Sequence, residues 1–409
     1  MSDETITMYG ALWCPDCIRS KDFLTEQRVP FEWIDIEADP TAAARVREIN
    51  DGKQIIPTIL FADGSILVEP SNDELARKLG LRLRAKKDSY DLIIVGGGPA
   101  GLTAAIYAAR ERIDCLVIEK SAPGGQPGRV ERYDNYPGFP GGVSGAEIAD
   151  RMVAQARENG VEILQAVAVG GIARDGERLR VTTDQGDEYS ARAVLIATGT
   201  GRRKLGVPGE ERLTGRGVHY CATCDGPLYR GADEVMVVGG GNAGLEEAIS
   251  LSRFAKLVRI VEFLPSLSAF RALQEKVLDR PEFRVHTETE VLRFEGERKL
   301  SSVVCHDRKT GEETTFQPAA AFVVIGMQPH SDFLRGSLDL DEKGFVVVDD
   351  SFQTSLPGVF AAGDIRSRSP RQLAAAVGDG VAAFMALRRY LQEPVAQPAG
   401  EQRPQAVKE

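Results

Sequence analysis

The chain has 409 residues, more than one hydrophobic core usually organises, so two or three domains are expected. Its composition, with 43% hydrophobic and 27% charged residues, is that of an ordinary globular protein, and a formal net charge of −10 argues against nucleic acid or an anionic membrane as partner. No apolar run reaches about 18 residues, and the first ten residues lack the basic and apolar segments of a secretion signal. We therefore expect a cytoplasmic protein.

The first 80 residues alternate between strand and helix patterns. In chain order, the expected elements are a strand over 5–9, a helix from Cys14 to about Gln27, a strand over 31–36, a helix around 41–49, a hairpin over 57–67 that turns at Asp63-Gly64, and a helix over 72–79. The order β-α-β-α-β-β-α in about 80 residues is typical of a thioredoxin-like domain.

Cys14 and Cys17 form a C-x-x-C pair at the start of the first expected helix. Unpaired backbone N–H groups and the helix dipole stabilise a thiolate at this position and lower its pKa toward neutrality. Cys14 is therefore the expected nucleophile and Cys17 the resolving thiol, while the charge of Asp16 opposes part of this stabilisation. Pro57 stands where thioredoxin-like folds place a cis-proline beside the disulfide.

A short basic stretch over 83–89 is the expected linker, and two similar strand–turn–helix–strand patterns follow, over 90–120 and 234–263. The repeat predicts two nucleotide-binding domains, so the fold class is α/β, with an N-terminal thioredoxin-like domain followed by two Rossmann-like domains. The expected limits are 1–82, then 90–205 with 327–392, then 206–326, and a tail over 393–409 that is rich in Pro, Gln and charge and is expected to be disordered.

Gly96, Gly98 and Gly101 fit G-x-G-x-x-G between an apolar strand and a helix. Gly96 allows the tight turn, Gly98 lets the backbone approach a pyrophosphate, and Gly101 permits close packing of helix on strand. The N–H groups and dipole at the helix start favour the phosphates. Glu119, at the end of the second strand, is placed to bind ribose hydroxyls, and this context predicts a dinucleotide site.

The second repeat has Gly239, Gly241 and Gly244 at the same spacing, with Glu262 in the position of the ribose-binding carboxylate. A carboxylate there repels the 2′-phosphate of NADPH and accepts from the free 2′-hydroxyl of NADH, so NADH is the expected coenzyme. Two alternatives stay open: a glycine-rich turn without a ligand, and a phosphate site completed by Arg259 or Arg271 bending back.

Cys221 and Cys224 form a second C-x-x-C pair, followed at once by Asp225, just ahead of the second glycine pattern. Because Gly226 and Pro227 interrupt any following helix, activation is expected from a flavin and a local acid, and Asp225 is placed to move protons; it is otherwise a turn-forming residue. A zinc site is disfavoured, since the two pairs lie about 200 residues apart and the histidines are scattered. The two remaining cysteines, Cys115 and Cys305, are expected as buried thiols in strands.

Residues 90–392 resemble the low-molecular-weight thioredoxin reductases through GGGPAG, GGQPGRVERYDNYPG, CATCDG, GGGNAG, GVFAAGDI and RQLAAAVGDG, in this order. The resemblance implies that Cys224 faces the flavin and that Cys221 attacks the acceptor disulfide. It implies FAD contacts from Gly96, Gly98, Pro99, Ala100, Gly101, Glu119, Gly125, Gln126, Asn135, Thr198, Gly199, Gly363, Asp364, Arg371, Gln372 and Ala374. The NADH contacts expected from the second glycine pattern are Gly239, Gly241, Asn242, Ala243, Gly244 and Glu262.

One departure bears on the coenzyme. Where thioredoxin reductases have a His-Arg-Arg segment for the NADPH phosphate, this chain has Val261-Glu262-Phe263. YCATCDGPL, GGGNAGLEEAI and VEFLPSLSAFRALQEKV instead resemble the NADH-dependent flavoprotein subunit of alkyl hydroperoxide reductase, which also has an N-terminal redoxin region, although one made of two thioredoxin folds. This resemblance implies a peroxiredoxin-type or thioredoxin-like protein partner and a homodimer.

Residues 1–82 resemble glutaredoxins, in particular the mycoredoxin type, through WCPDC, FADGS and EPSNDEL. The family's Thr-Val-Pro is Ile55-Ile56-Pro57 here, and the C-terminal Gly-Gly-x-Asp that binds glutathione is missing. The expected activity is therefore a relay from NADH through FAD and Cys221/Cys224 to Cys14/Cys17, and on to a protein disulfide. The alternatives are an NADPH-dependent thioredoxin reductase, a ferredoxin-dependent enzyme of the same fold, and an N-terminal domain that serves as an iron–sulfur or docking module.

Overall fold

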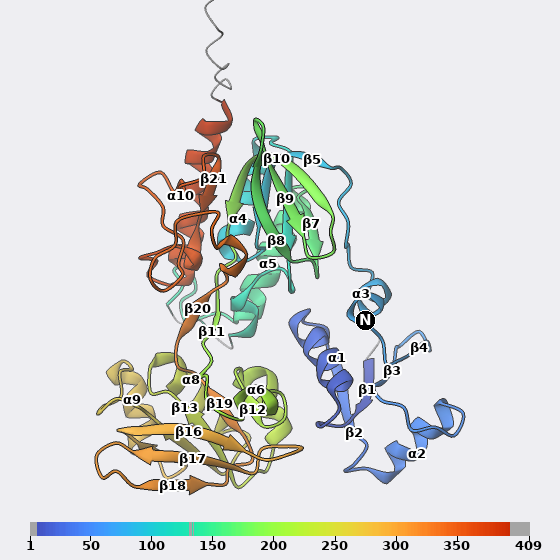
Figure 1. The fold of residues 1–409 in the computed structure, drawn as a ribbon, viewed down its shortest axis with the longest axis vertical. Coiled ribbons are helices and arrows are strands. Elements are labelled where there is room, and N and C mark those ends of the chain that lie inside the picture. Colours follow the sequence, from blue (N-terminus) through green and yellow to red (C-terminus); the bar gives the residue numbers. More distant parts are fainter. Residues whose placement is uncertain (1–5, 131–132, 134, 393–409) are drawn as a thin grey trace, which may run out of the picture.

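A computed structural model describes residues 6–130, 133 and 135–392 of the chain. Figure 1 shows three parts, of which the blue N-terminal part lies to one side of the other two. The α/β fold class predicted from the sequence is confirmed. The expected disorder of 393–409 concerns residues outside those that the structure describes.

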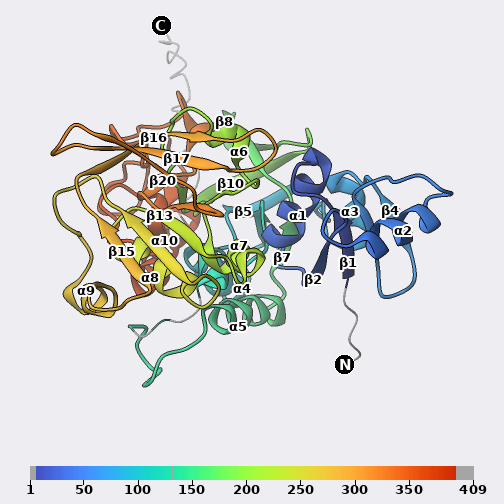
Figure 2. The ribbon, with the colours of Figure 1, turned by 90° about the horizontal axis from the view of Figure 1, so that it is seen from below.

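The N-terminal part, which we call the redoxin domain, has a four-stranded sheet in the order β2-β1-β3-β4. Its elements follow the predicted order: β1 Ile6–Gly10, α1 Pro15–Glu26, β2 Phe31–Asp35, α2 Pro40–Ile49, β3 Thr58–Leu60, β4 Ile66–Val68 and α3 Asn72–Lys78. The hairpin turns at Asp63-Gly64, and the Ile56–Pro57 bond is cis, as predicted. In both views α1 faces the other two parts and α2 lies on the far side (Figures 1 and 2).

The first nucleotide-binding domain has a seven-stranded sheet in the order β7-β6-β5-β10-β9-β8, with β21 paired to β10. Its strands are β5 Ser89–Val95, β6 Cys115–Glu119, β7 Glu162–Gln165, β8 Val169–Asp175, β9 Arg178–Thr183, β10 Glu188–Ile196 and β21 Val359–Ala361. The apolar run that forms β5 is buried between α4 Pro99–Arg110 on one face and the β8–β9 hairpin on the other. Helices α5 Gly145–Glu158 and α10 Leu373–Gln392 complete the helical layer. The domain also has short 3-10 helices, η1 Gln126–Arg129, η4 Gly363–Ile365 and η3 Asp332–Leu334, the last of which packs against the β8–β9 hairpin.

The second nucleotide-binding domain has a parallel five-stranded sheet in the order β12-β19-β13-β14-β15. Its elements are α6 Glu210–Leu213, β12 Val218–His219, α7 Ala222–Asp225, η2 Gly226–Tyr229, β13 Glu234–Val238, α8 Asn242–Leu251, β14 Leu257–Val261, α9 Arg271–Leu278, β15 Phe283–His286, β19 Ala321–Val323 and the antiparallel layer β16 Thr289–Glu295, β17 Ser302–Asp307 and β18 Glu313–Phe316. The chain passes between the two domains through the antiparallel pair β11 Thr200–Arg202 and β20 Met327–Pro329, seen between the upper and lower parts of Figure 1.

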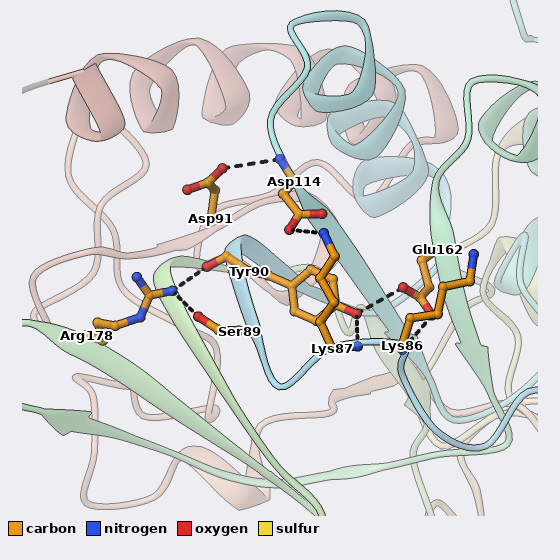
Figure 3. A network of polar contacts seen from close by, with 8 residues as sticks. All are labelled: Lys86, Lys87, Ser89, Tyr90, Asp91, Asp114, Glu162 and Arg178. Carbon is orange, nitrogen blue, oxygen red and sulfur yellow. Dashed lines mark hydrogen bonds and ion pairs between the residues drawn. The ribbon is translucent and has the colours of Figure 1, made fainter.

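The segment that joins the redoxin domain to β5 is fixed to the first nucleotide-binding domain (Figure 3). The Glu162 carboxylate accepts from the Arg82 guanidinium at 2.9 Å, from the Lys86 N–H at 3.0 Å and from the Tyr90 hydroxyl at 2.9 Å. That hydroxyl accepts in turn from the Lys87 N–H. The stretch expected as a linker is therefore anchored to the first nucleotide-binding domain at Lys86 and Lys87, next to Arg82.

Cys115 in β6 and Cys305 in β17 are free and buried, as predicted for structural thiols. Burial raises the pKa of both thiols, that of Cys305 to about 12. Among the described residues, no helix combines the length and the apolarity that a membrane crossing requires.

Candidate active site

Cys14 and Cys17 lie at the start of α1, as the spacing predicts. Cys14 is the residue that caps the helix, and its Sγ accepts from the Cys17 N–H at 3.2 Å. Both cysteines are free and buried, and burial raises the pKa of the Cys17 thiol. The pair therefore has the geometry of an N-terminal nucleophile with a shielded resolving thiol.

The loop of residues 221–225, which we call the cysteine loop, leads into the second glycine motif. Cys221 is disulfide-bonded, and α7 is a single turn that η2 follows at Gly226, so no long helix activates the pair. The structure does not describe the Cys224 side chain. Glu247 on α8 accepts from the Ala222 N–H and pairs with Arg202 at 2.7 Å, and it thus holds the loop against the helix of the second glycine motif. Sequence reasoning missed Glu247.

Asp225 lies at the centre of a polar network that crosses two domains. One carboxylate oxygen is 2.7 Å from the Lys21 ammonium of the redoxin domain, and the other is 3.1 Å from Nδ1 of His219. Burial raises the pKa of Asp225, but His219 and Lys21 together outweigh burial and hold this pKa well below its ordinary value. His219 was one of the scattered histidines of the sequence, and its place two residues before Cys221 was the signal available.

The end of α1 contacts the first nucleotide-binding domain. The Arg28 guanidinium donates to the Pro123 carbonyl and lies 3.1 Å from the Asp150 carboxylate, while the Glu26 carbonyl accepts from the Ala122 N–H at 2.9 Å. Near the start of α1, the ring of Trp13, the neighbour of Cys14, packs against Arg298 of the second nucleotide-binding domain. The Arg298 guanidinium carbon lies 5.2 Å from the centroid of the Trp13 ring. The redoxin domain therefore contacts both nucleotide-binding domains through the helix that carries its cysteines.

The first glycine motif has the shape of a dinucleotide cradle. At Gly96 φ is +108°, and a Cβ there would lie 2.4 Å from the Ala197 carbonyl oxygen, so only glycine fits. At Gly98, by contrast, a Cβ would meet nothing closer than the Gly125 Cα at 3.9 Å, so the backbone at the start of α4 borders open space. The Glu119 carboxylate accepts from the Gly97 N–H at 2.6 Å. Open backbone at a helix start, beside a carboxylate, fits the pyrophosphate and ribose of FAD.

Several other residues expected at FAD lie around this motif. The Gln126 amide donates to the Thr200 carbonyl at 2.5 Å, and the Asn135 amide donates to Gln372 at 3.2 Å across 237 positions. Burial raises the pKa of Asp364. The other residues expected at FAD lie at the ends of elements. The first turn of α4 contains Pro99, Ala100 and Gly101, and that of α10 contains Ala374. Of the rest, Gly125 precedes η1, Arg371 precedes α10, Gly363 and Asp364 begin η4, and Thr198 and Gly199 follow β10. Asp379, which accepts from the Gly363 N–H at 3.1 Å and pairs with Arg366, was missed.

The second glycine motif repeats this geometry. A Cβ at Gly239 would lie 2.2 Å from the Val324 carbonyl oxygen, whereas one at Gly241 would meet only Ser268 Oγ, at 3.6 Å. The buried Glu262 carboxylate accepts from the Gly240 N–H at 2.5 Å and from the Leu264 N–H at 2.8 Å. Asn242, Ala243 and Gly244 form the first turn of α8, and Asn242 accepts from the Phe270 N–H at 2.7 Å.

The cations near Glu262 bear on the coenzyme. Arg259 forms a bidentate pair with Glu234 at 2.6 and 2.8 Å, and Arg271, on the exposed face of α9, pairs with Glu275 at 3.3 Å. Sequence reasoning missed Arg308, whose guanidinium lies 3.8 Å from the centroid of the half-exposed Phe263 ring and donates to the Phe263 carbonyl. Arg308 is thus a cation held on the residue that follows Glu262 in the chain.

Comparison with known proteins assigns both regions. A family model described as pyridine nucleotide-disulphide oxidoreductase matches residues 90–380, and a glutaredoxin model matches residues 6–66. Thioredoxin reductases of Streptomyces clavuligerus and Treponema pallidum are 40% and 42% identical, over 76% and 74% of this chain and 98% and 97% of theirs. The crystal structure of Lactococcus lactis thioredoxin reductase, in its FR conformation, covers 74% of this chain and 99% of its own, with 36% identity and a TM-score of 0.70.

Proposed function

The chain belongs to the pyridine nucleotide-disulphide oxidoreductases, and on that premise we propose that it relays electrons from NADH to its own redoxin domain. It is a thioredoxin-reductase-like disulfide oxidoreductase with a glutaredoxin domain, and this family uses FAD and NAD(P)H. The chemistry that these cofactors supply is hydride transfer from the nicotinamide to the flavin and release of two electrons to a disulfide.

The chain's own groups supply binding, exchange and proton transfer. The first glycine motif with Glu119 holds FAD, and the second with Glu262 holds NADH. Cys221 and Cys224 receive the two electrons as a dithiol, and Asp225 handles their protons. Cys221 then attacks the Cys14–Cys17 disulfide, so that the redoxin domain leaves reduced.

The observation that carries this proposal is the 2.7 Å contact between Lys21 and Asp225. It joins the helix that begins at Cys14 to the loop that contains Cys221, so the two cysteine pairs belong to neighbouring surfaces. The pinned segment around Glu162 keeps the redoxin domain close to this position, which raises the effective concentration of one pair at the other.

We place the protein in the cytoplasm, as a homodimer, with a peroxiredoxin-type or thioredoxin-like disulfide protein as the final acceptor. NADH is the proposed coenzyme because Glu262 would repel a 2′-phosphate and its carboxylate is already positioned by two backbone N–H groups. Stopped-flow bleaching of the flavin tests this point. Faster bleaching by NADH supports it, faster bleaching by NADPH makes the protein an NADPH-dependent enzyme, and bleaching by neither favours a ferredoxin-type donor.

A paired substitution tests the relay. In a Cys14→Ser/Cys17→Ser variant, NADH-dependent reduction of an added protein disulfide should fall by about tenfold or more, because the carrier is removed, while flavin bleaching by NADH stays at the rate of the unmodified protein. Undiminished reduction of the disulfide would show that the redoxin domain is not the carrier. A brown N-terminal domain with visible absorbance would instead indicate an iron–sulfur module.

A further inference from the structure

Lys21 is an unusual residue for an amphipathic helix, because its side chain is only 7% exposed. Lysine is almost never fully buried unless an opposite charge pairs with it. Lys21 lies about two helical turns beyond Cys14 on α1, and its ammonium reaches across to the second nucleotide-binding domain, where it donates to Asp225. The redoxin domain thus places a buried cation on the acid of the cysteine loop.

Besides Lys21, His219 balances the charge of Asp225. His219 contacts the second carboxylate oxygen and is itself 2.7 Å from the Tyr229 hydroxyl. Within the part of the chain that the structure describes, Asp22 on α1, Glu247 on α8 and Tyr229 on η2 are further ionisable groups that interact electrostatically with Asp225. Lys21 is therefore the cation whose presence depends on where the redoxin domain lies, whereas His219 belongs to the same domain as Asp225.

We propose that Lys21 is a positioning residue for disulfide exchange: when the redoxin domain contacts the cysteine loop, Lys21 keeps Asp225 ionised, and Asp225 can then accept the proton of the Cys221 thiol. This inference rests on the relay proposed above. It assigns a proton-transfer role to a contact that would otherwise only hold two domains together.

The exchange that this contact serves balances in protons and electrons. The Cys221 thiol gives its proton to Asp225, and the thiolate attacks Cys14 Sγ, so that a Cys221–Cys14 disulfide forms as the Cys14–Cys17 bond breaks and the Cys17 thiolate leaves. Cys224, whose proton goes to the Cys17 thiolate, then attacks Cys221 and expels the Cys14 thiolate, which takes the proton from Asp225. Two electrons pass from one pair to the other, and no proton is gained or lost overall.

The state of Asp225 changes when the redoxin domain moves away. An opposite charge within about 4–6 Å lowers the pKa of a carboxyl by about 1–3, so loss of Lys21 raises the pKa of Asp225. Burial acts in the same direction. Asp225 therefore stays ionised down to lower pH while the exchange partner is in place, and it holds its own proton more readily when that partner is absent.

Single-turnover exchange at several pH values tests this role. One equivalent of NADH is mixed with the FAD-loaded full chain, and the appearance of Cys14 and Cys17 thiols is followed by acid quench, alkylation and mass spectrometry from about pH 4.5 to about pH 9. The rate at which these thiols appear should fall at low pH, along an acid limb where Asp225 becomes protonated. We expect Lys21→Arg to keep the dependence of this rate on pH that the unmodified protein shows. Lys21→Met should move the acid limb to higher pH, and Lys21→Glu should move it further, toward about pH 6, because two adjacent carboxyls cannot both ionise easily.

Two controls separate this role from simple docking. Arg19→Glu makes the same charge change on α1, at a side chain that pairs with Asp16, and Arg28→Met weakens the contact with the first nucleotide-binding domain; both should leave the position of the acid limb unchanged. Profiles of the Lys21 variants that superimpose on that of the unmodified protein after scaling would overturn the inference and leave the relay intact. Absence of Cys14 and Cys17 thiols in the unmodified protein would instead overturn the relay.

Discussion

The Glu262 carboxylate accepts a hydrogen bond of 2.5 Å from the backbone N–H of Gly240, and Glu119 accepts one of 2.6 Å from Gly97 in the same way. Each glycine motif is thus closed by a carboxylate from the end of the following strand. In the first motif, we propose that this carboxylate binds the ribose of FAD. In the second, we propose that its charge selects NADH over NADPH.

We expect Glu262→Gln to shift the ratio of kcat/KM for NADPH to that for NADH upward by about tenfold or more, since a hydrogen bond to a charged group contributes about 1.5–3 kcal/mol. The amide keeps an acceptor for the Gly240 N–H, and we expect Arg308, which lies over the neighbouring Phe263 ring, to attract the 2′-phosphate. Initial rates with both coenzymes measure the ratio. Glu119→Gln serves as the matched control and should leave the ratio unchanged; the prediction fails if Glu262→Gln does so as well.

Substitution by alanine at two glycines of the first motif should have different effects on stability and on FAD binding. Gly98→Ala should fold with a similar melting temperature but retain FAD about tenfold less tightly, because its Cβ enters only the open space of the cradle. Gly96→Ala should cost about 3 kcal/mol or more of stability, because it combines a positive φ with a contact of 2.4 Å. Thermal unfolding and FAD titration of the apoprotein compare the variants, and equal loss of stability in both would contradict the account.

The segment that joins the redoxin domain to β5 should become accessible to trypsin when Glu162, which anchors it, is replaced. Glu162→Ala leaves the Tyr90 hydroxyl and two other donors without their acceptor, at a cost of about 1–3 kcal/mol, so trypsin should cut at residues 82–87 several times faster. Asp114→Ala removes only the exposed ion pair with Lys87, which contributes about 0–1 kcal/mol, and serves as the control. Limited proteolysis with mass spectrometry gives both rates; a segment that is free in solution would be cut equally fast in all three proteins.

The buried thiols should resist alkylation. With a pKa of about 12, Cys305 is a thiolate in about one molecule in 10⁴ at pH 8, and the fraction rises only as the pH approaches that pKa. After reduction by NADH, iodoacetamide at about pH 8 should therefore label Cys14 while Cys115 and Cys305 stay unlabelled until the protein is denatured. Peptide mass spectrometry reads each site, and labelling of Cys305 in the folded protein would contradict its burial.

The sequence predicted what depends on local rules. The order of elements in the redoxin domain, the start of a helix at Cys14, the cis bond before Pro57 and the two glycine motifs all follow from short patterns whose physical causes lie within a few residues. The pairing of Glu119 and Glu262 with their loops was likewise accessible, because each carboxylate ends the strand next to its motif.

The contacts that the sequence did not predict join residues that lie far apart in the chain. Lys21 and Asp225 are 204 positions apart, and in the sequence Lys21 is an ordinary charged residue of a helix. Arg308 reaches Phe263 from the turn after β17, and Glu162 pins a segment 76 positions earlier. Such contacts require the relative placement of whole domains, which no local pattern specifies.

The central claim is that electrons from NADH reach Cys14 and Cys17 only through Cys221. The most direct measurement is anaerobic addition of one equivalent of NADH to the FAD-loaded chain and to its Cys221→Ser variant, followed by acid quench, alkylation and peptide mass spectrometry. The relay predicts that Cys14 and Cys17 become doubly alkylated in the unmodified protein and remain a disulfide in Cys221→Ser. A disulfide that persists in the unmodified protein, or equal alkylation in both, would contradict it.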